Sequence, residues 1–148
     1  MKRLVFCIPI FVILSCLIAC NKKTEEKEKK FLSNCIERLD ITDNYQWIVI
    51  LPGTGCHGCI QDGEFFMKKN IGNNKVLFIL TKISSLKILQ QKLGLQIKDH
   101  SNIYIDKENI FDIPSNNSIY PCVIKLEKGK ILTYAFQSPR NNAFHLLK

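Results

Sequence analysis

The fold of this chain is decided by the stretch Ile48-Val49-Ile50-Leu51-Pro52-Gly53-Thr54-Gly55-Cys56-His57-Gly58-Cys59-Ile60-Gln61-Asp62. Its apolar start has the length and composition of a buried strand, and Pro52-Gly53 ends that run. A short loop follows, and then two cysteines spaced as C-x-x-C open a segment that fits a helix. The stretch therefore predicts a strand, a loop and a helix whose first turn carries both cysteines.

Two cysteines at the start of a helix have a well-defined chemistry. The first lies among backbone N–H groups that lack intrahelical partners, at the positive end of the helix dipole, and this favours its thiolate. The second, one turn further in, can attack a mixed disulfide on the first and release the product. A structural disulfide, or half of a zinc site, is the alternative interpretation of the same spacing.

The N-terminus has the pattern of an export signal. Met1-Lys2-Arg3 is basic, and residues 4–18 are apolar apart from Ser15 but shorter than the roughly 20 residues of a membrane span. The run ends in Leu17-Ile18-Ala19-Cys20, which resembles the lipobox of bacterial lipoproteins. The resemblance implies that residues 1–19 are removed and that Cys20 carries the lipid; an uncleaved N-terminal anchor is the alternative. Both interpretations, the lipoprotein signal and the uncleaved anchor, place the rest of the chain in the cell envelope, on the periplasmic side, where disulfides persist.

Length and charge limit the remaining possibilities. The chain has 148 residues and a formal charge of +8, and 129 residues remain without the signal peptide, enough for one domain with a real core. Residues 20–30 are nearly all charged or polar and predict a tether, followed by a single domain over 31–148. The lysines are scattered, without an arginine-rich or aromatic-interleaved patch, so nucleic acid is not an expected partner.

The cysteines divide into groups. Four of the seven remain once the signal peptide and Cys20 are set aside: Cys35, Cys56, Cys59 and Cys122. Four cysteines allow three pairings, and the C-x-x-C spacing favours Cys56–Cys59. Cys35 lies on an apolar helical stripe and is expected to be a small buried side chain. Cys122 is expected to be buried and unreactive, with disulfide exchange with Cys59 or pairing with Cys35 as the alternative.

Hydrophobic periodicity predicts an alternation of strands and helices along the rest of the chain. The sequence predicts strands at 45–51, 75–80, 101–105, 121–126 and 130–136, and helices at 31–39, 57–70 and 84–93, with a short one from residue 139. Gly94 marks the end of the third helix, and Glu127-Lys128-Gly129 is the turn of a hairpin.

This order resembles that of thioredoxin-fold proteins, and most closely the TlpA-like group of membrane-tethered thiol–disulfide oxidoreductases. The resemblance covers about residues 45–148. It is carried by Cys56-His57-Gly58-Cys59 after an apolar strand, by Ser118-Ile119-Tyr120-Pro121-Cys122-Val123-Ile124, and by the hairpin Lys125-Leu126-Glu127-Lys128-Gly129-Lys130-Ile131. It implies an α/β, thioredoxin-like fold with a central mixed β-sheet flanked by helices.

The resemblance also implies roles for individual residues. In the family a cis proline faces the C-x-x-C motif and leaves the preceding backbone free to pair with substrate, which here gives Pro121 and Tyr120. A cis Pro121 would also bring Cys122 within a few ångströms of the motif. Asp62 matches a glutamate that accepts the proton of the second thiol, a task that partial burial of a carboxylate favours. A trans proline at a strand start and a solvent-exposed acid are the alternatives.

Departures from the family pattern surround the motif. Gly55 stands where tryptophan is usual, Gly58 where proline is usual, and Ile50 where the thioredoxins proper have a buried acid. A more flexible and less shielded dithiol is expected from these changes. His57, if protonated, would stabilise the Cys56 thiolate and make the disulfide more oxidising; a solvated loop histidine is the alternative.

The sequence therefore favours a membrane-anchored thiol–disulfide oxidoreductase in which Cys56 attacks the substrate disulfide and Cys59 resolves the mixed disulfide. Such a protein needs no cofactor, and its partners are protein dithiol or disulfide substrates and a redox donor. Two alternatives remain. One is a thioredoxin-fold binding module with a structural disulfide, and the other is a Cu(I) module that uses Cys56, Cys59 and either His57 or Cys122.

Overall fold

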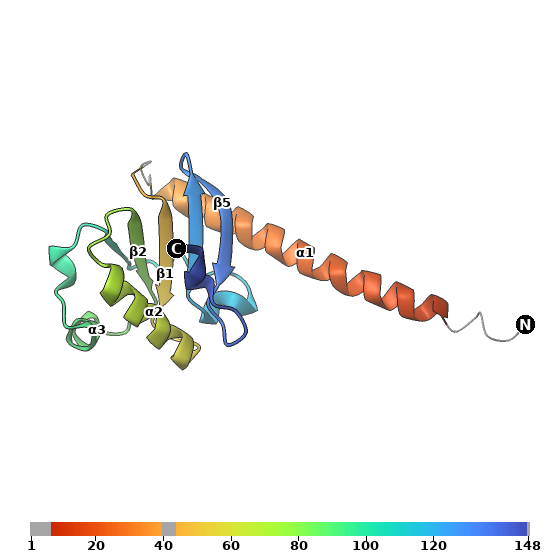
Figure 1. Cartoon of the computed structure of the whole chain (residues 1–148), viewed down its shortest axis with the longest axis horizontal. Helices are drawn as coiled ribbons and strands as arrows, with labels where there is room; N and C mark the ends of the chain where they lie inside the picture. Colours follow the sequence, from red (N-terminus) through yellow and green to blue (C-terminus); the bar gives the residue numbers. More distant parts are fainter. Residues whose placement is uncertain (1–6, 40–43, 148) are drawn as a thin grey trace, which may run out of the picture.

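Strand β1, the predicted strand before the two cysteines, lies at the centre of a five-stranded sheet (Figure 1). The structure is a computed structural model that describes the backbone of residues 7–39 and 44–147, and the side chains of those residues from 22 onward. The sheet order is β3-β2-β1-β4-β5, with β1, β2 and β3 parallel and β4 and β5 antiparallel to their neighbours. The strands are β1 (Trp47–Pro52), β2 (Val76–Thr81), β3 (Ile103–Asp106), β4 (Cys122–Glu127) and β5 (Lys130–Phe136). The predicted α/β class, with a mixed sheet flanked by helices, is confirmed.

Helices cover both faces of this sheet (Figure 1). Helices α2 (His57–Asn70) and α3 (Leu86–Leu93) lie on one face, and α1 (Cys7–Arg38) lies on the other and projects away toward the N-terminus. Ser85 accepts a hydrogen bond from the Ile88 amide at the start of α3, and Gly94 ends the helix in the left-handed conformation. The predicted helix over 57–70 is confirmed, and the helix predicted over 84–93 is confirmed with its start two residues later, at Leu86.

The C-terminal helix predicted from residue 139 forms only as a single 3₁₀ segment, η3 (Ala143–Leu147). Ser138 and Asn141 exchange backbone hydrogen bonds, which folds residues 138–141 into a turn. The Gln137 side-chain oxygen accepts a hydrogen bond from the backbone N–H of Ala143, the first residue of η3. The 3₁₀ segment therefore begins only after this turn. Two further 3₁₀ segments, η1 (Ile97–Asp99) and η2 (Asn116–Ile119), connect the other elements.

The alternation of side chains along β1 divides the core into two clusters. Ile48 and Ile50 pack on the face covered by α1, and Val49 and Leu51 pack on the face covered by α2 and α3. Because both faces are buried, the strand reads as an unbroken apolar run rather than as an alternating one. This arrangement fixes the position of the loop that leaves β1 and carries the two cysteines.

Helix α1 contacts the sheet earlier than the sequence suggests. Its predicted apolar stripe is confirmed, with Leu32, Cys35 and Ile36 buried. Glu28 is also buried, at 4 % exposed, although it lies in the segment 20–30 that predicts a solvated tether. Contacts between α1 and the rest of the fold therefore begin within that segment.

The predictions about the signal peptide and about lipid on Cys20 concern side chains that lie outside the described residues. None of the helices that the structure describes is both long and apolar enough to cross a membrane. The fold does not test these predictions.

Candidate redox site

Cys56 and Cys59 form a disulfide across the first turn of α2, with their Cα atoms 5.3 Å apart. This agrees with the pairing that the spacing favours. Cys56 is the N-cap residue and is partly exposed, whereas Cys59 is buried, at 4 % exposed. Thiol–disulfide exchange needs this asymmetry, because the attacking sulfur must reach a substrate and the resolving sulfur must be shielded from other partners.

Backbone hydrogen bonds hold the loop between β1 and α2 at two points. The Gly53 amide donates to the Thr81 carbonyl at the end of β2, over 2.8 Å. The Cys56 amide donates to the carbonyl of Ile119, the last residue of η2, over 3.0 Å. Sequence reasoning missed Ile119 as part of the site, because a backbone acceptor leaves no side-chain signal.

The peptide bond between Tyr120 and Pro121 is trans, since no peptide bond within the described residues is cis. The cis proline implied by the family resemblance is therefore wrong here. Tyr120 has an extended backbone, which is the conformation favoured before proline, and its amide donates to the Asn117 carbonyl. Pro121 is buried against α2, and a Cβ on Gly63 would lie 3.3 Å from its ring. Contact of Tyr120 and Pro121 with substrate stays a prediction.

Asp62 lies on α2, one turn beyond Cys59, and is exposed to solvent. Its carboxylate accepts a hydrogen bond from the buried Gln137 side chain, over 3.2 Å. The backbone N–H of Gln137 in turn donates to the Pro121 carbonyl. Asp62 is thereby connected to the start of β4. The partly buried carboxylate implied by the resemblance is absent, and a role for Asp62 as a base stays a prediction. His57 is likewise exposed, in the first turn of α2.

The structure separates Cys122 from the disulfide. Cys122 is the first residue of β4 and packs in the cluster covered by α1, on the opposite face of the sheet from α2. The expectation that it lies within a few ångströms of Cys56 and Cys59 depended on a cis Pro121, and that condition is not met. Cys35 belongs to the same cluster, and its thiol donates to the Ile110 carbonyl over 3.0 Å.

Both of these cysteines are free and buried. Burial raises the pKa of the Cys122 thiol well above its usual range, and the negative charge of Glu28 raises it further. Burial also raises the pKa of Cys35, against a smaller lowering by Arg38. Neither thiol is therefore a ready nucleophile, because the thiolate is the reactive form.

We accordingly expect Cys122 to resist alkylation in the native protein. At pH 8, iodoacetamide should label Cys122 roughly a hundredfold more slowly in the native chain than in denaturant, because the buried thiol is neither charged nor accessible. Mass mapping of the non-reduced protein reads out both labelling and pairing. A Cys35–Cys122 or Cys59–Cys122 bridge in most molecules would show that the thiol takes part in exchange.

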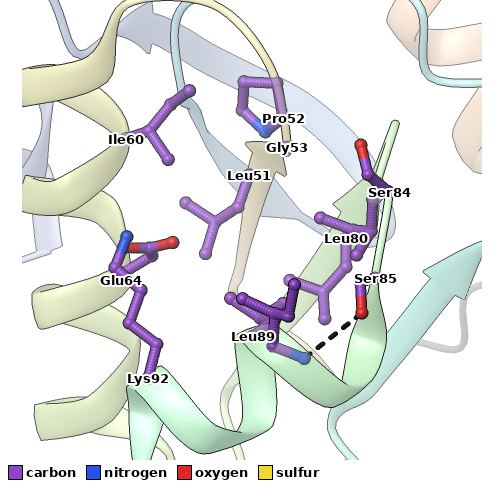
Figure 2. A pocket seen from close by; sticks show the side chains of 12 residues that line it. Leu51, Pro52, Gly53, Ile60, Glu64, Leu80, Ser84, Ser85, Leu89 and Lys92 are labelled. Atoms are coloured by element: carbon purple, nitrogen blue, oxygen red, sulfur yellow. Dashed lines mark hydrogen bonds and ion pairs between the residues drawn. The ribbon is translucent and has the colours of Figure 1, made fainter.

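A recess of about 220 Å³ lies between α2 and α3, at the carboxyl ends of β1 and β2 (Figure 2). Leu51, Leu80 and Leu89 form its apolar floor, and an ion pair between Glu64 and Lys92 lies at its rim. Ile60, the residue after Cys59, contributes to one wall. The helix that carries the disulfide therefore has an apolar cavity on the side that faces α3.

The described residues include no group of three or more His, Cys, Asp or Glu side chains that is arranged to hold a metal ion. Cys122, on the other face of the sheet, is not placed to join Cys56 and Cys59 around Cu(I). Comparison of the chain with known protein families, characterised proteins and solved structures found no match. The case for a function therefore rests on the geometry of the site.

Proposed function

We propose that this protein is an extracytoplasmic, membrane-anchored thiol–disulfide oxidoreductase with a thioredoxin-like fold, of the TlpA-like group. The observation that carries the proposal is the Cys56–Cys59 disulfide at the start of α2, with Cys56 partly exposed and Cys59 buried. A purely structural disulfide has no need of this asymmetry or of a helix N-terminus, which favours a thiolate at Cys56.

In the reduced protein, the Cys56 thiolate attacks one sulfur of a substrate disulfide. A mixed disulfide forms, and the other substrate sulfur leaves as a thiolate that takes up a proton from water. Cys59 then loses its proton and attacks the Cys56 sulfur, which closes the Cys56–Cys59 disulfide and releases the second substrate thiol. Two electrons pass to the substrate, and a dithiol donor protein restores the pair. The opposite direction uses the same steps in reverse order.

The order of elements supports the thioredoxin-like assignment. The central strand β1 leads directly into the helix that carries the cysteines, and the antiparallel hairpin β4–β5 follows Pro121 on the neighbouring side of β1. The trans bond before Pro121 departs from the family pattern. The substrate contact proposed for Tyr120 therefore depends on its position beside η2 rather than on proline geometry.

Disulfide reduction tests the proposal directly. The full chain, purified in detergent, is given dithiothreitol and insulin, and turbidity from the reduced insulin chains is followed. We expect a rate well above that of Cys56→Ser under identical conditions, because only the wild type has the nucleophile. Equal rates would leave a binding module with a structural disulfide as the better interpretation.

The midpoint potential of the pair then gives the direction of transfer. A value near the roughly −270 mV of thioredoxin indicates a reductase, and one near about −120 mV indicates an oxidase. Equilibration of the full chain with glutathione mixtures, followed by trapping and mass analysis, measures it.

The lipid anchor carries its own prediction. Cys20→Ala should block lipidation and leave the uncleaved precursor, because Leu17-Ile18-Ala19 precedes this cysteine alone and a polar stretch follows it. A radioactive fatty acid measures incorporation, and Cys16→Ala, four residues earlier, is the matched control and should incorporate label normally. Incorporation that persists in Cys20→Ala would contradict the assignment. Stable retention requires the diacyl group, since one acyl chain anchors only marginally.

A further inference from the structure

Glu28 is a buried carboxylate in a helix whose neighbouring residues are exposed. Three side chains from the other end of the chain surround it. Ser115 and Asn117 donate to its Oε1 over 2.5 and 2.9 Å, and the Tyr134 hydroxyl lies 3.1 Å from its Oε2. A buried charge is tolerated only when hydrogen bonds replace its lost hydration, so this set of partners holds α1 at a defined position.

The Glu28 contacts lead directly to the redox site. Ser115 is the N-cap of η2, where its hydroxyl also accepts the Asn117 amide, and η2 ends at Ile119. The Ile119 carbonyl accepts the amide of Cys56 over 3.0 Å. The segment from Ser115 to Ile119 thus connects the buried carboxylate to the carbonyl that accepts the Cys56 amide.

We propose that Glu28 is a positioning residue for Cys56: by fixing η2 through Ser115 and Asn117, it holds the Ile119 carbonyl in place for the Cys56 amide. The N-terminal helix is thereby linked to the redox centre. This inference rests on the proposed function, since it concerns how the nucleophile of that reaction is held.

The link has a chemical consequence for the reduced protein. The Cys56 sulfur is stabilised as a thiolate only while it lies at the start of α2, close to the free N–H groups of the first turn. If Glu28 is lost, Ser115 and Asn117 lose a buried acceptor and η2 is less firmly held. The amide of Cys56 then loses its fixed partner, and the thiolate becomes less favoured.

The test compares Glu28→Ala with wild type by the pH profile of Cys56 alkylation. Both are made with Cys59→Ser in the full chain in detergent, and labelled Cys56 is quantified by peptide mass. We expect Glu28→Ala to label Cys56 at least threefold more slowly at pH 7 and to shift the profile to higher pH. Glu28→Gln retains an acceptor oxygen for Ser115 and Asn117 and should shift the profile less.

Glu26→Gln is the matched control, because Glu26 is an exposed acid of the same helix and should leave the profile unchanged. A folded Glu28→Ala protein with the wild-type profile would overturn the proposal. If circular dichroism shows Glu28→Ala to be unfolded, Asn117→Ala replaces it, and an unchanged profile there has the same meaning. The assay uses iodoacetamide and no protein substrate, so it gives its answer even if insulin reduction fails.

Discussion

Replacement of Cys56 by serine is expected to reduce disulfide exchange to the rate of the reagents alone. Cys56 is the N-cap of α2 and the more exposed residue of the pair, so we expect a substrate to reach its sulfur rather than that of Cys59. A serine hydroxyl at this position is far less acidic than a thiol and cannot form a disulfide with substrate. Insulin turbidity with the full chain measures the loss, and Cys122→Ser is the control that should retain turnover to within about twofold, because the Cys122 thiol is buried and largely protonated.

Cys59→Ser should behave differently from Cys56→Ser. The nucleophile remains, but the buried sulfur that resolves the mixed disulfide is missing, so the substrate stays bonded to Cys56. A non-reducing gel should show an adduct of the combined mass, and peptide mapping should place the bond at Cys56. Full turnover by Cys59→Ser, or faster alkylation of Cys59 than of Cys56 in the reduced wild type, would mean that the two roles are assigned the wrong way round.

The sheet and the main helices could be predicted from the sequence because their signals are local. The run from Ile48 to Leu51 and the run in β2 are apolar without a break, which is the pattern of strands buried on both faces. Ser85 caps the start of helix α3 with its side chain, and Gly94 ends the helix in the left-handed conformation. Both roles are typical of these residue types. These features depend on neighbours a few residues away, and tertiary contacts reinforce rather than override them.

The contacts across the sheet could not be predicted in the same way. Alternation along β4 places Cys122 and Val123 on opposite faces, but the pattern alone does not say which face carries α1 and which carries α2. The sequence alone therefore could not place the Cys122 side chain on the face that α1 covers. Glu28 left no signal at all, because it lies in a run of charged residues and its partners lie 87 to 106 residues further along the chain.

Only part of the candidate site could be predicted from the sequence. The disulfide pair followed from spacing, whereas the expected environment of Asp62 and the geometry at Pro121 came from family resemblance and differ in the structure. The departures from the family at Gly55 and Gly58 suggested a looser dithiol. The structure gives these two glycines different environments, although only two residues lie between them.

Gly55 lies where the loop from β1 passes closest to η2. Its backbone has a φ of +141°, which side-chain-bearing residues rarely adopt. A Cβ at this position would lie 2.4 Å from the Ile119 carbonyl oxygen and 2.7 Å from the Ile119 Cα, and both are backbone atoms that cannot rotate away. A tryptophan, usual at this position in the TlpA-like group that the sequence resembles, cannot occupy this loop conformation. Gly58, in the first turn of α2, has no atom within 4 Å of the same built position.

We therefore expect Gly55→Ala to destabilise the protein by roughly 2–5 kcal/mol, from backbone strain together with overpacking against Ile119. The displaced loop should also lose the hydrogen bond from Cys56 to Ile119, and turnover should fall with stability. Gly58→Ala, on the other side of Cys56, is the control and should be neutral or stabilising by up to about 1 kcal/mol, because alanine favours the helix. Urea unfolding of the oxidised full chain compares the two. If Gly55→Ala were as stable as Gly58→Ala, the close contact between this loop and η2 would not be part of the folded protein.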